Sequence, residues 1–280
     1  MTGSNLTSER HTGGRFAFGA NWQAFLRSLT EERIVEAERS LQQMLDCDSL
    51  RAKRFLDIGS GSGLSSLAAR RLGATVHSFD FDLQSVACTA ELRQRYFPND
   101  AGWRVDHGSV LDVGYLATLG HFDVVYSWGV LHHTGAMWQA MDNLPMLLPA
   151  DGTVFVALYN DQGWPSRVWW WVKRLYGATP RWLRWVILGP VAIRIWGPRM
   201  IYDCLRLRPF QTWRSYAKHR GMSPWHDLVD WSGGFPFEVC RPEAVLAWGR
   251  RHGLVLERMT TCGGGLGCNQ FVLRRASHGS

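Results

Sequence analysis

The chain has 280 residues, of which 46% are hydrophobic and 20% charged, and its formal net charge is +7. This composition excludes a disordered protein and favours one globular domain with an insertion over two full domains. The six cysteines show no disulfide-framework spacing, and the polar first fourteen residues show no signal-peptide pattern, so we expect a cytoplasmic protein.

The first fifty residues are predicted to form a tail and a helix that precedes the main domain. Residues 1–14 are polar. Thr30 can begin a helix whose first turn is acidic and whose apolar residues recur every three or four positions as far as Leu45. We therefore assign residues 1–50 to a tail and cap helix, and residues 51–275 to the main domain.

Short apolar segments alternate with helical ones in the main domain, as a parallel sheet with crossover helices requires. Five strands are predicted at residues 54–58, 75–79, 103–106, 122–127 and 153–158. Three helices fit between them, at residues 64–72, 83–96 and 137–147. A later helix and two strands are predicted at residues 243–252, 254–260 and 270–274. The chain is therefore expected to be an α/β protein with a doubly wound sheet and a ligand crevice at the carboxyl ends of its strands.

A glycine-rich turn, Gly59-Ser60-Gly61-Ser62-Gly63, directly follows the first predicted strand. Glycine is required where the backbone takes positive φ or touches a ligand without an intervening Cβ. Alone this pattern is weak evidence, because several nucleotide-binding folds share it. Asp57 precedes the turn, where an acid suits a cationic cofactor and would repel a pyrophosphate. Asp80 ends the next strand, where a carboxylate can accept both hydroxyls of a ribose.

With these residues in place, the segment Arg54–Leu158 resembles the class I S-adenosylmethionine (SAM)-dependent methyltransferases. The resemblance implies the Rossmann-like, seven-stranded fold of that class and SAM as the cofactor. It places the glycine loop against the methionine part of SAM and Asp80 on the ribose. Ser109 stands where the family often has an Asp for the adenine. The candidate cofactor-binding residues are Asp57, Gly59, Ser60, Gly61, Gly63, Asp80, Phe81, Ser109, Val110, Ser127 and Trp128.

Two adjacent histidines, His132 and His133, follow the fourth predicted strand, where the crevice should open. Methyl transfer to a hydroxyl or thiol needs alignment of the reactants and an acceptor for the proton, and imidazole is a suitable base. Adjacent side chains diverge, so at most one of the two should face the methyl group. Packing, cofactor binding or catalysis by proximity alone remain alternatives.

Further candidates for the acceptor site lie after the fifth strand and near residue 226. His226 is a rival base within an aromatic and acidic segment, which could equally anchor the insertion itself. Cys262 and Cys268 lack the spacing of a structural zinc site, so no metal is predicted. The candidate residues for acceptor contact are Tyr159, Asn160, Trp225 and Asp227.

Residues 164–235 are predicted to form a Trp- and Arg-rich helical lid or insertion. The stretch from Trp164 to Arg220 holds 12 Lys or Arg against a single acid, Asp203, and 8 of the 15 tryptophans. Prolines should divide it into short helices, and its arginines interrupt any membrane span. A lid over the acceptor is our first hypothesis, peripheral contact with an anionic membrane the second, and a nucleic-acid surface the third.

The leader helix, the histidine after the fourth strand and the two-strand ending are similar to the 3-demethylubiquinol O-methyltransferase-like group. This resemblance implies a small-molecule acceptor but does not name it. We expect a SAM-dependent methyltransferase that acts on an oxygen or sulfur of a small or lipophilic acceptor. An RNA methyltransferase and a non-catalytic SAM-binding protein are the alternatives.

Overall fold

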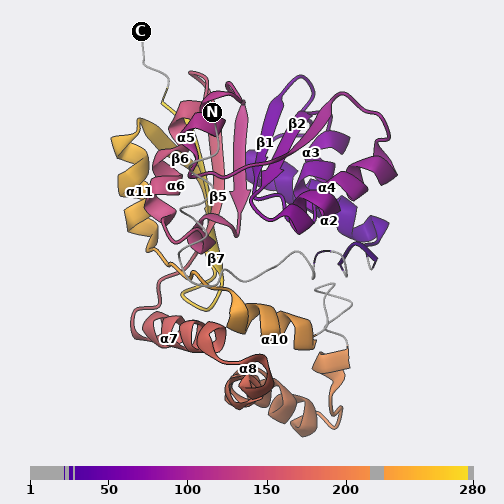
Figure 1. Cartoon of the computed structure of the whole chain (residues 1–280), viewed down its shortest axis with the longest axis vertical. Coiled ribbons are helices and arrows are strands. Elements are labelled where there is room, and N and C mark those ends of the chain that lie inside the picture. The colour runs from indigo at the N-terminus through magenta and orange to yellow at the C-terminus, as the bar shows by residue number, and fades with distance from the viewer. Residues whose placement is uncertain (1–21, 23–24, 28, 215–223, 277–280) are drawn as a thin grey trace.

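The computed structural model describes the chain apart from residues 1–21, 23–24, 28, 215–223 and 277–280. Figure 1 shows an α/β part built on one sheet, and a layer of helices beyond the edge where strand β5 (Thr153–Tyr159) ends. That layer corresponds to the predicted insertion.

Seven strands form the sheet in the order β3-β2-β1-β4-β5-β7-β6, which confirms the predicted fold. The other parallel strands are β1 (Arg54–Ile58), β2 (Thr75–Asp80), β3 (Trp103–His107) and β4 (Val124–Trp128). The antiparallel strands are β6 (Leu254–Thr260) and β7 (Cys268–Arg275), and β7 lies between β5 and β6. The strand order reverses between β1 and β4, so a ligand crevice is expected at the carboxyl ends of these two strands.

Helices bury apolar side chains on both faces of the sheet, which is why most strand residues in its centre are apolar. One face packs against α2 (Glu31–Leu45), α3 (Leu64–Arg71) and α4 (Leu83–Tyr96). The other packs against α5 (Val113–Ala117), α6 (Met137–Asp142) and α11 (Pro242–Arg251). The sheet is thus covered on both faces, so a ligand site is expected at the ends of its strands rather than on a face.

The predicted helix over residues 137–147 is two elements, because α6 ends at Asp142 and a separate 3-10 turn, η3 (Leu144–Leu147), follows it. Pro145 lies in this turn. Proline has no N–H for a helical hydrogen bond and disfavours helical backbone in the residue before it. The break is therefore a local effect that the apolar pattern alone does not reveal.

The insertion consists of α7 (Trp164–Ala178), the 3-10 turn η4 (Arg181–Leu183), α8 (Trp185–Leu205) and α10 (Pro224–Gly233). These elements share a core of their own, made of Tyr176, Leu188, Val191, Trp196 and Leu228.

The expectation that prolines divide the insertion into short helices is wrong for α8, which continues through Pro190 and Pro198 for 21 residues. Each interior proline removes one backbone hydrogen bond. Burial of Val191 and Trp196, which adjoin the prolines closely in sequence, favours a continuous helix despite that loss. Among the helices described, none combines the length and apolar content needed to cross a membrane.

Candidate active site

The glycine turn between β1 and α3 adopts positive φ at Gly59 (76°), Gly61 (55°) and Gly63 (80°). A Cβ added to Gly59 would lie 2.3 Å from Cγ1 of Val130, and one added to Gly61 would lie 3.1 Å from Cε2 of Trp22. The turn therefore needs glycine for its backbone conformation and for close packing. No local pattern in the sequence indicated the contacts of Val130 and Trp22.

Asp80, at the end of β2, holds this turn in place. One carboxylate oxygen accepts a hydrogen bond from the Gly61 N–H at 2.9 Å, and the other accepts from the Asp82 N–H at 2.9 Å. Burial raises the pKa of Asp80 to about 6, although these backbone hydrogen bonds lower it. The neighbouring Phe81 carries a ring 6.2 Å from that of His107. Asp80 thus joins the ends of β1 and β2 through one carboxylate.

Asp57, which precedes the turn, lies behind it and is almost fully buried. Its Oδ2 accepts a hydrogen bond of 2.5 Å from the Ser66 hydroxyl, which is 2.7 Å from that of Ser78. Burial raises the pKa of Asp57 to about 7, and the nearby charge of Asp80 adds to this effect. Asp57 therefore anchors the turn to α3.

The predicted residues at the ends of β3 and β4 are mostly buried. Ser109 accepts a hydrogen bond from the Leu111 N–H at 3.1 Å, and Val110 belongs to the core. The Ser127 hydroxyl donates to the Ile58 carbonyl at 3.0 Å, which ties β4 to β1. Trp128 is exposed and comes directly after Ser127. The structure therefore exposes Trp128 and buries both serines at these strand ends.

The two histidines lie in the 3-10 turn η2 (Leu131–His133) and differ in their surroundings. The His132 ring is fully buried, and its centroid lies 3.8 Å from that of Tyr159. Its Nδ1 accepts a hydrogen bond from the Tyr159 N–H at 3.3 Å, and among the described residues its Nε2 has no partner. Burial, followed by the charges of His133 and Lys173, holds the pKa of His132 well below its usual range.

His133 is half-buried, and its Nδ1 lies 2.7 Å from the carbonyl oxygen of Pro236. A carbonyl can only accept, so Nδ1 carries the proton and Nε2 is the acceptor in the neutral ring. In His132 the proton lies on Nε2 instead, because Nδ1 accepts the hydrogen bond from the Tyr159 N–H. In the neutral ring, Nε2 of His133 is therefore the nitrogen that carries no proton.

The insertion meets the sheet around Tyr159. Lys173 of α7 is fully buried, donates a hydrogen bond to the Trp231 carbonyl of α10, and lies 4.1 Å from the centroid of the Trp231 ring. The Tyr159 ring centroid is 5.6 Å from that of Trp231 and 5.3 Å from that of Phe237. These contacts form an aromatic wall beside the two histidines.

The other predicted acceptor residues are not brought into this wall. Asn160 donates to the Gly265 carbonyl at 3.3 Å and accepts from Asn269 at 3.0 Å, so it holds the connection between β6 and β7. Trp225 is an exposed residue of α10. The side chains of His226 and Asp227 lie outside the part of the chain that the structure describes.

A family model described as a methyltransferase domain matches residues 29–227. No curated protein sequence matches the chain.

Several solved structures share the fold. Magnesium protoporphyrin IX methyltransferase from Synechocystis PCC 6803 with bound SAH is 13% identical, with a TM-score of 0.53, over 87% of this chain and 83% of that one. Its structure with bound SAM is 11% identical, with a TM-score of 0.50, over 98% and 92%. PKMT2 from Rickettsia typhi in complex with AdoHcy is 13% identical, with a TM-score of 0.55, over 85% and 52%.

Proposed function

The chain belongs to the methyltransferase-domain family and is a SAM-dependent methyltransferase, and from that premise we propose that it methylates an oxygen or sulfur of a small or lipophilic acceptor. Bound SAM supplies the methyl group on a sulfonium. The residues of the chain must hold the two reactants in line and accept a proton.

The Asp80 carboxylate is the observation that carries the cofactor part of the proposal. A carboxylate has about four acceptor positions, and the backbone N–H groups of Gly61, Asp82 and Phe81 all interact with that of Asp80. The acceptor capacity that remains suits a hydroxyl of a ribose. Gly59 and Gly61 would then face the methionine part, while Asp57 supports the turn from behind.

We assign the proton acceptor to His133 rather than His132. The hydrogen bond from its Nδ1 to the Pro236 carbonyl orients the ring and presents Nε2 as the base. His132 accepts through Nδ1 and is fully buried, and its lowered pKa opposes protonation. His132 is better suited to orient Tyr159 and contact the acceptor than to accept the proton.

The acceptor would lie against the aromatic wall, with the insertion, residues 164–235, as its lid. Three buried polar atoms of the described residues lack a partner here: Nε2 of His132, Nε1 of Trp231 and Oγ of Ser232. Leaving such groups unpaired costs about 1–3 kcal/mol each. A flat acceptor that carries hydroxyl or carbonyl groups would pair them, which supports a phenolic or quinol-like acceptor of the 3-demethylubiquinol kind.

A transfer assay with labelled SAM tests this function. Quinols, catechols, thiols, lipid-linked sugars and RNA are incubated with the full chain, and the labelled product is identified. Label on a phenolic oxygen or a thiol sulfur supports the proposal. Label on RNA contradicts it, and so does the absence of any product from a protein that binds SAM normally.

A further inference from the structure

Helix α7 presents an apolar face to the outside. Trp164, Val168, Trp171 and Leu175 are spaced by four, three and four residues, so they lie on one side of the helix. Their exposed fractions run from 43% at Val168 to 73% at Trp164. The opposite side carries Lys173, which is buried against α10. The apolar face therefore points away from the core of the protein.

Helix α8 has a comparable face. Val186, Ile193, Ile201 and Leu205 fall on one side of the helix, with exposed fractions from 47% at Val186 to 79% at Leu205. The exposed Arg194 lies on the same side. Figure 1 shows α7 and α8 in the same helical layer, beyond the end of the sheet. Single exposed apolar residues are ordinary, but several on one side of each of two helices mark an interaction surface.

The charge of the insertion is mostly positive. Residues 164–235 hold 12 Lys or Arg against three acids, Asp203, Asp227 and Asp230. Asp203 is buried, and its two oxygens accept hydrogen bonds from the backbone N–H and the hydroxyl of Thr212, at 2.7 and 2.6 Å. The insertion thus exposes positive charge beside apolar surface, which complements an anionic partner with an apolar interior.

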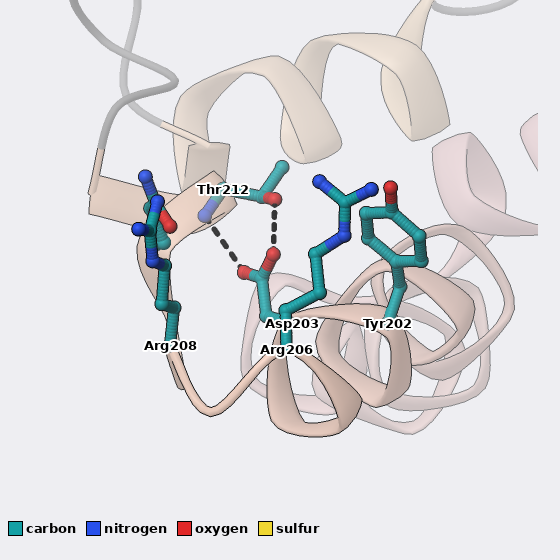
Figure 2. Close-up of a pocket in the computed structure, with 6 residues that line it drawn as sticks. Tyr202, Asp203, Arg206, Arg208 and Thr212 are labelled. Carbon is teal, nitrogen blue, oxygen red and sulfur yellow. Dashed lines mark hydrogen bonds between the residues drawn. The ribbon is translucent and has the colours of Figure 1, made fainter.

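A cavity at the end of α8 adds a place for an anionic group. It has a volume of about 510 Å³ and is lined by Tyr202, Asp203, Arg206, Arg208, Gln211 and Thr212. In Figure 2, Asp203 points to Thr212, and Arg206 lies between this pair and Tyr202.

The chemistry of the cavity suits a phosphate group. Two guanidinium groups and the Asp203 carboxylate line it, so the charged groups of the lining sum to +1. The carboxylate is hydrogen-bonded to Thr212, and guanidinium recognises phosphate well. The apolar Leu205 and Leu207 adjoin these arginines in sequence and are 79% and 90% exposed. Such a pairing of cations with exposed apolar side chains matches the headgroup region of a bilayer.

We propose that the outer face of the insertion docks on an anionic lipid bilayer. The apolar faces of α7 and α8 enter the boundary between headgroups and acyl chains, and the cavity of Arg206 and Arg208 receives a lipid phosphate. A nucleic acid fits less well, because its surface offers nothing to cover aliphatic side chains such as Ile193 and Leu205. Docking goes beyond the proposed function, since it depends neither on SAM nor on the acceptor.

Sedimentation with lipid vesicles tests the proposal. The full chain is mixed at physiological ionic strength with vesicles of phosphatidylcholine alone or with phosphatidylglycerol added. We expect sedimentation with the anionic vesicles and much less with the zwitterionic ones. The double variant Ile193→Glu/Leu205→Glu should lose more than tenfold in partitioning. Val255→Glu on β6, an apolar position that is 57% exposed and lies outside the insertion, is the control and should partition like the wild type.

A second pair of variants tests the phosphate cavity. Arg206→Gln/Arg208→Gln should weaken binding to anionic vesicles by about tenfold to thirtyfold, because each arginine near the membrane surface contributes about 1 kcal/mol. Arg250→Gln/Arg251→Gln on α11 removes the same charge from another exposed place and should have a small effect. Circular dichroism and SAM affinity verify that each variant is folded.

Three results would overturn the proposal. The first is wild-type protein that stays in the supernatant with anionic vesicles. The second is an equal loss of vesicle binding in the two double arginine variants, which would show that only the net charge of the protein matters. The third is a wild-type dimer that Ile193→Glu/Leu205→Glu dissociates without any change in vesicle binding, which would show that a second copy of the chain covers this face.

Discussion

Replacing Gly59 with alanine tests why the turn after β1 requires glycine. Gly59 has a φ of 76°, and a Cβ there would lie 2.3 Å from Cγ1 of Val130. The left-handed conformation costs an alanine about 1–2 kcal/mol, and a methyl group forced into occupied space costs about 1–3 kcal/mol more. We expect Gly59→Ala to lower the free energy of unfolding by about 2–5 kcal/mol in urea denaturation.

Gly129 provides the matched control. Its φ is also 76°, and nothing beyond its chain neighbours lies within 4 Å of a Cβ placed there. Gly129→Ala should therefore cost only the backbone part, about 1–2 kcal/mol. Adding Val130→Ala to Gly59→Ala should recover part of the loss, with a favourable coupling of about 1 kcal/mol or more in a double-mutant cycle. Equal losses in the two glycine variants, or no coupling, would refute the steric explanation.

Three further substitutions test the site. Asp57→Asn should reduce the pH dependence of the free energy of unfolding, because burial raises the Asp57 pKa from 3.8 to about 7. The raised pKa of Asp80 leaves part of that dependence in the variant. A carboxyl group whose pKa is raised on folding contributes fully to the free energy of unfolding below pH 3.8, where it is protonated in both states. This contribution falls as the pH rises to 7, by about 4 kcal/mol at 1.36 kcal/mol per pH unit. Asp80→Asn should weaken SAM binding by about tenfold to a hundredfold in calorimetry, because hydrogen bonds to a charged group contribute about 1.5–3 kcal/mol. His133→Gln keeps a donor for the Pro236 carbonyl but has no base, so kcat should fall about a hundredfold while SAM affinity stays unchanged.

Each of these predictions has its own contradicting result. If the stability difference between wild type and Asp57→Asn is constant from pH 4 to 7, burial does not perturb this carboxyl group. Normal SAM affinity in Asp80→Asn removes the proposed ribose contact. A loss of SAM affinity that matches the loss of kcat in His133→Gln assigns that histidine to cofactor binding or packing.

Local patterns were sufficient to predict the strands of the α/β part and most of its helices, although α5 was not predicted and the helix over residues 137–147 is two elements. Helix α4 begins at Leu83 and ends at Tyr96, as predicted, because the Asp82 carboxylate accepts from the Gln84 N–H at its start and Pro98 follows its end. The glycine turn and Asp80 could also be predicted, from their spacing relative to the first two strands. Each depends on a strand and a turn that are adjacent in the sequence.

The remaining features depend on contacts between distant parts of the chain. Trp22 packs over Gly61, and Lys173 is buried against Trp231, yet no local pattern marks either pair. Asn160 holds Gly265 because β5 pairs with β7, and this pairing is set by the whole sheet. Helix α8 continues through its prolines for the same reason, since burial in the insertion core outweighs a local preference.

The place of β7 in the sheet determines which parts of the protein can fold first during synthesis. β7 pairs with β5 on one side and with β6 on the other, although β6 precedes it in the chain. While the ribosome is still adding residues 268–275, β5 has an open edge and the core lacks Phe271 and Leu273. Helices α7, α8 and α10 are complete a few seconds earlier, at about 5–20 residues per second. The residues of the helical layer are therefore all synthesised before β7 can pair with β5 and complete the sheet.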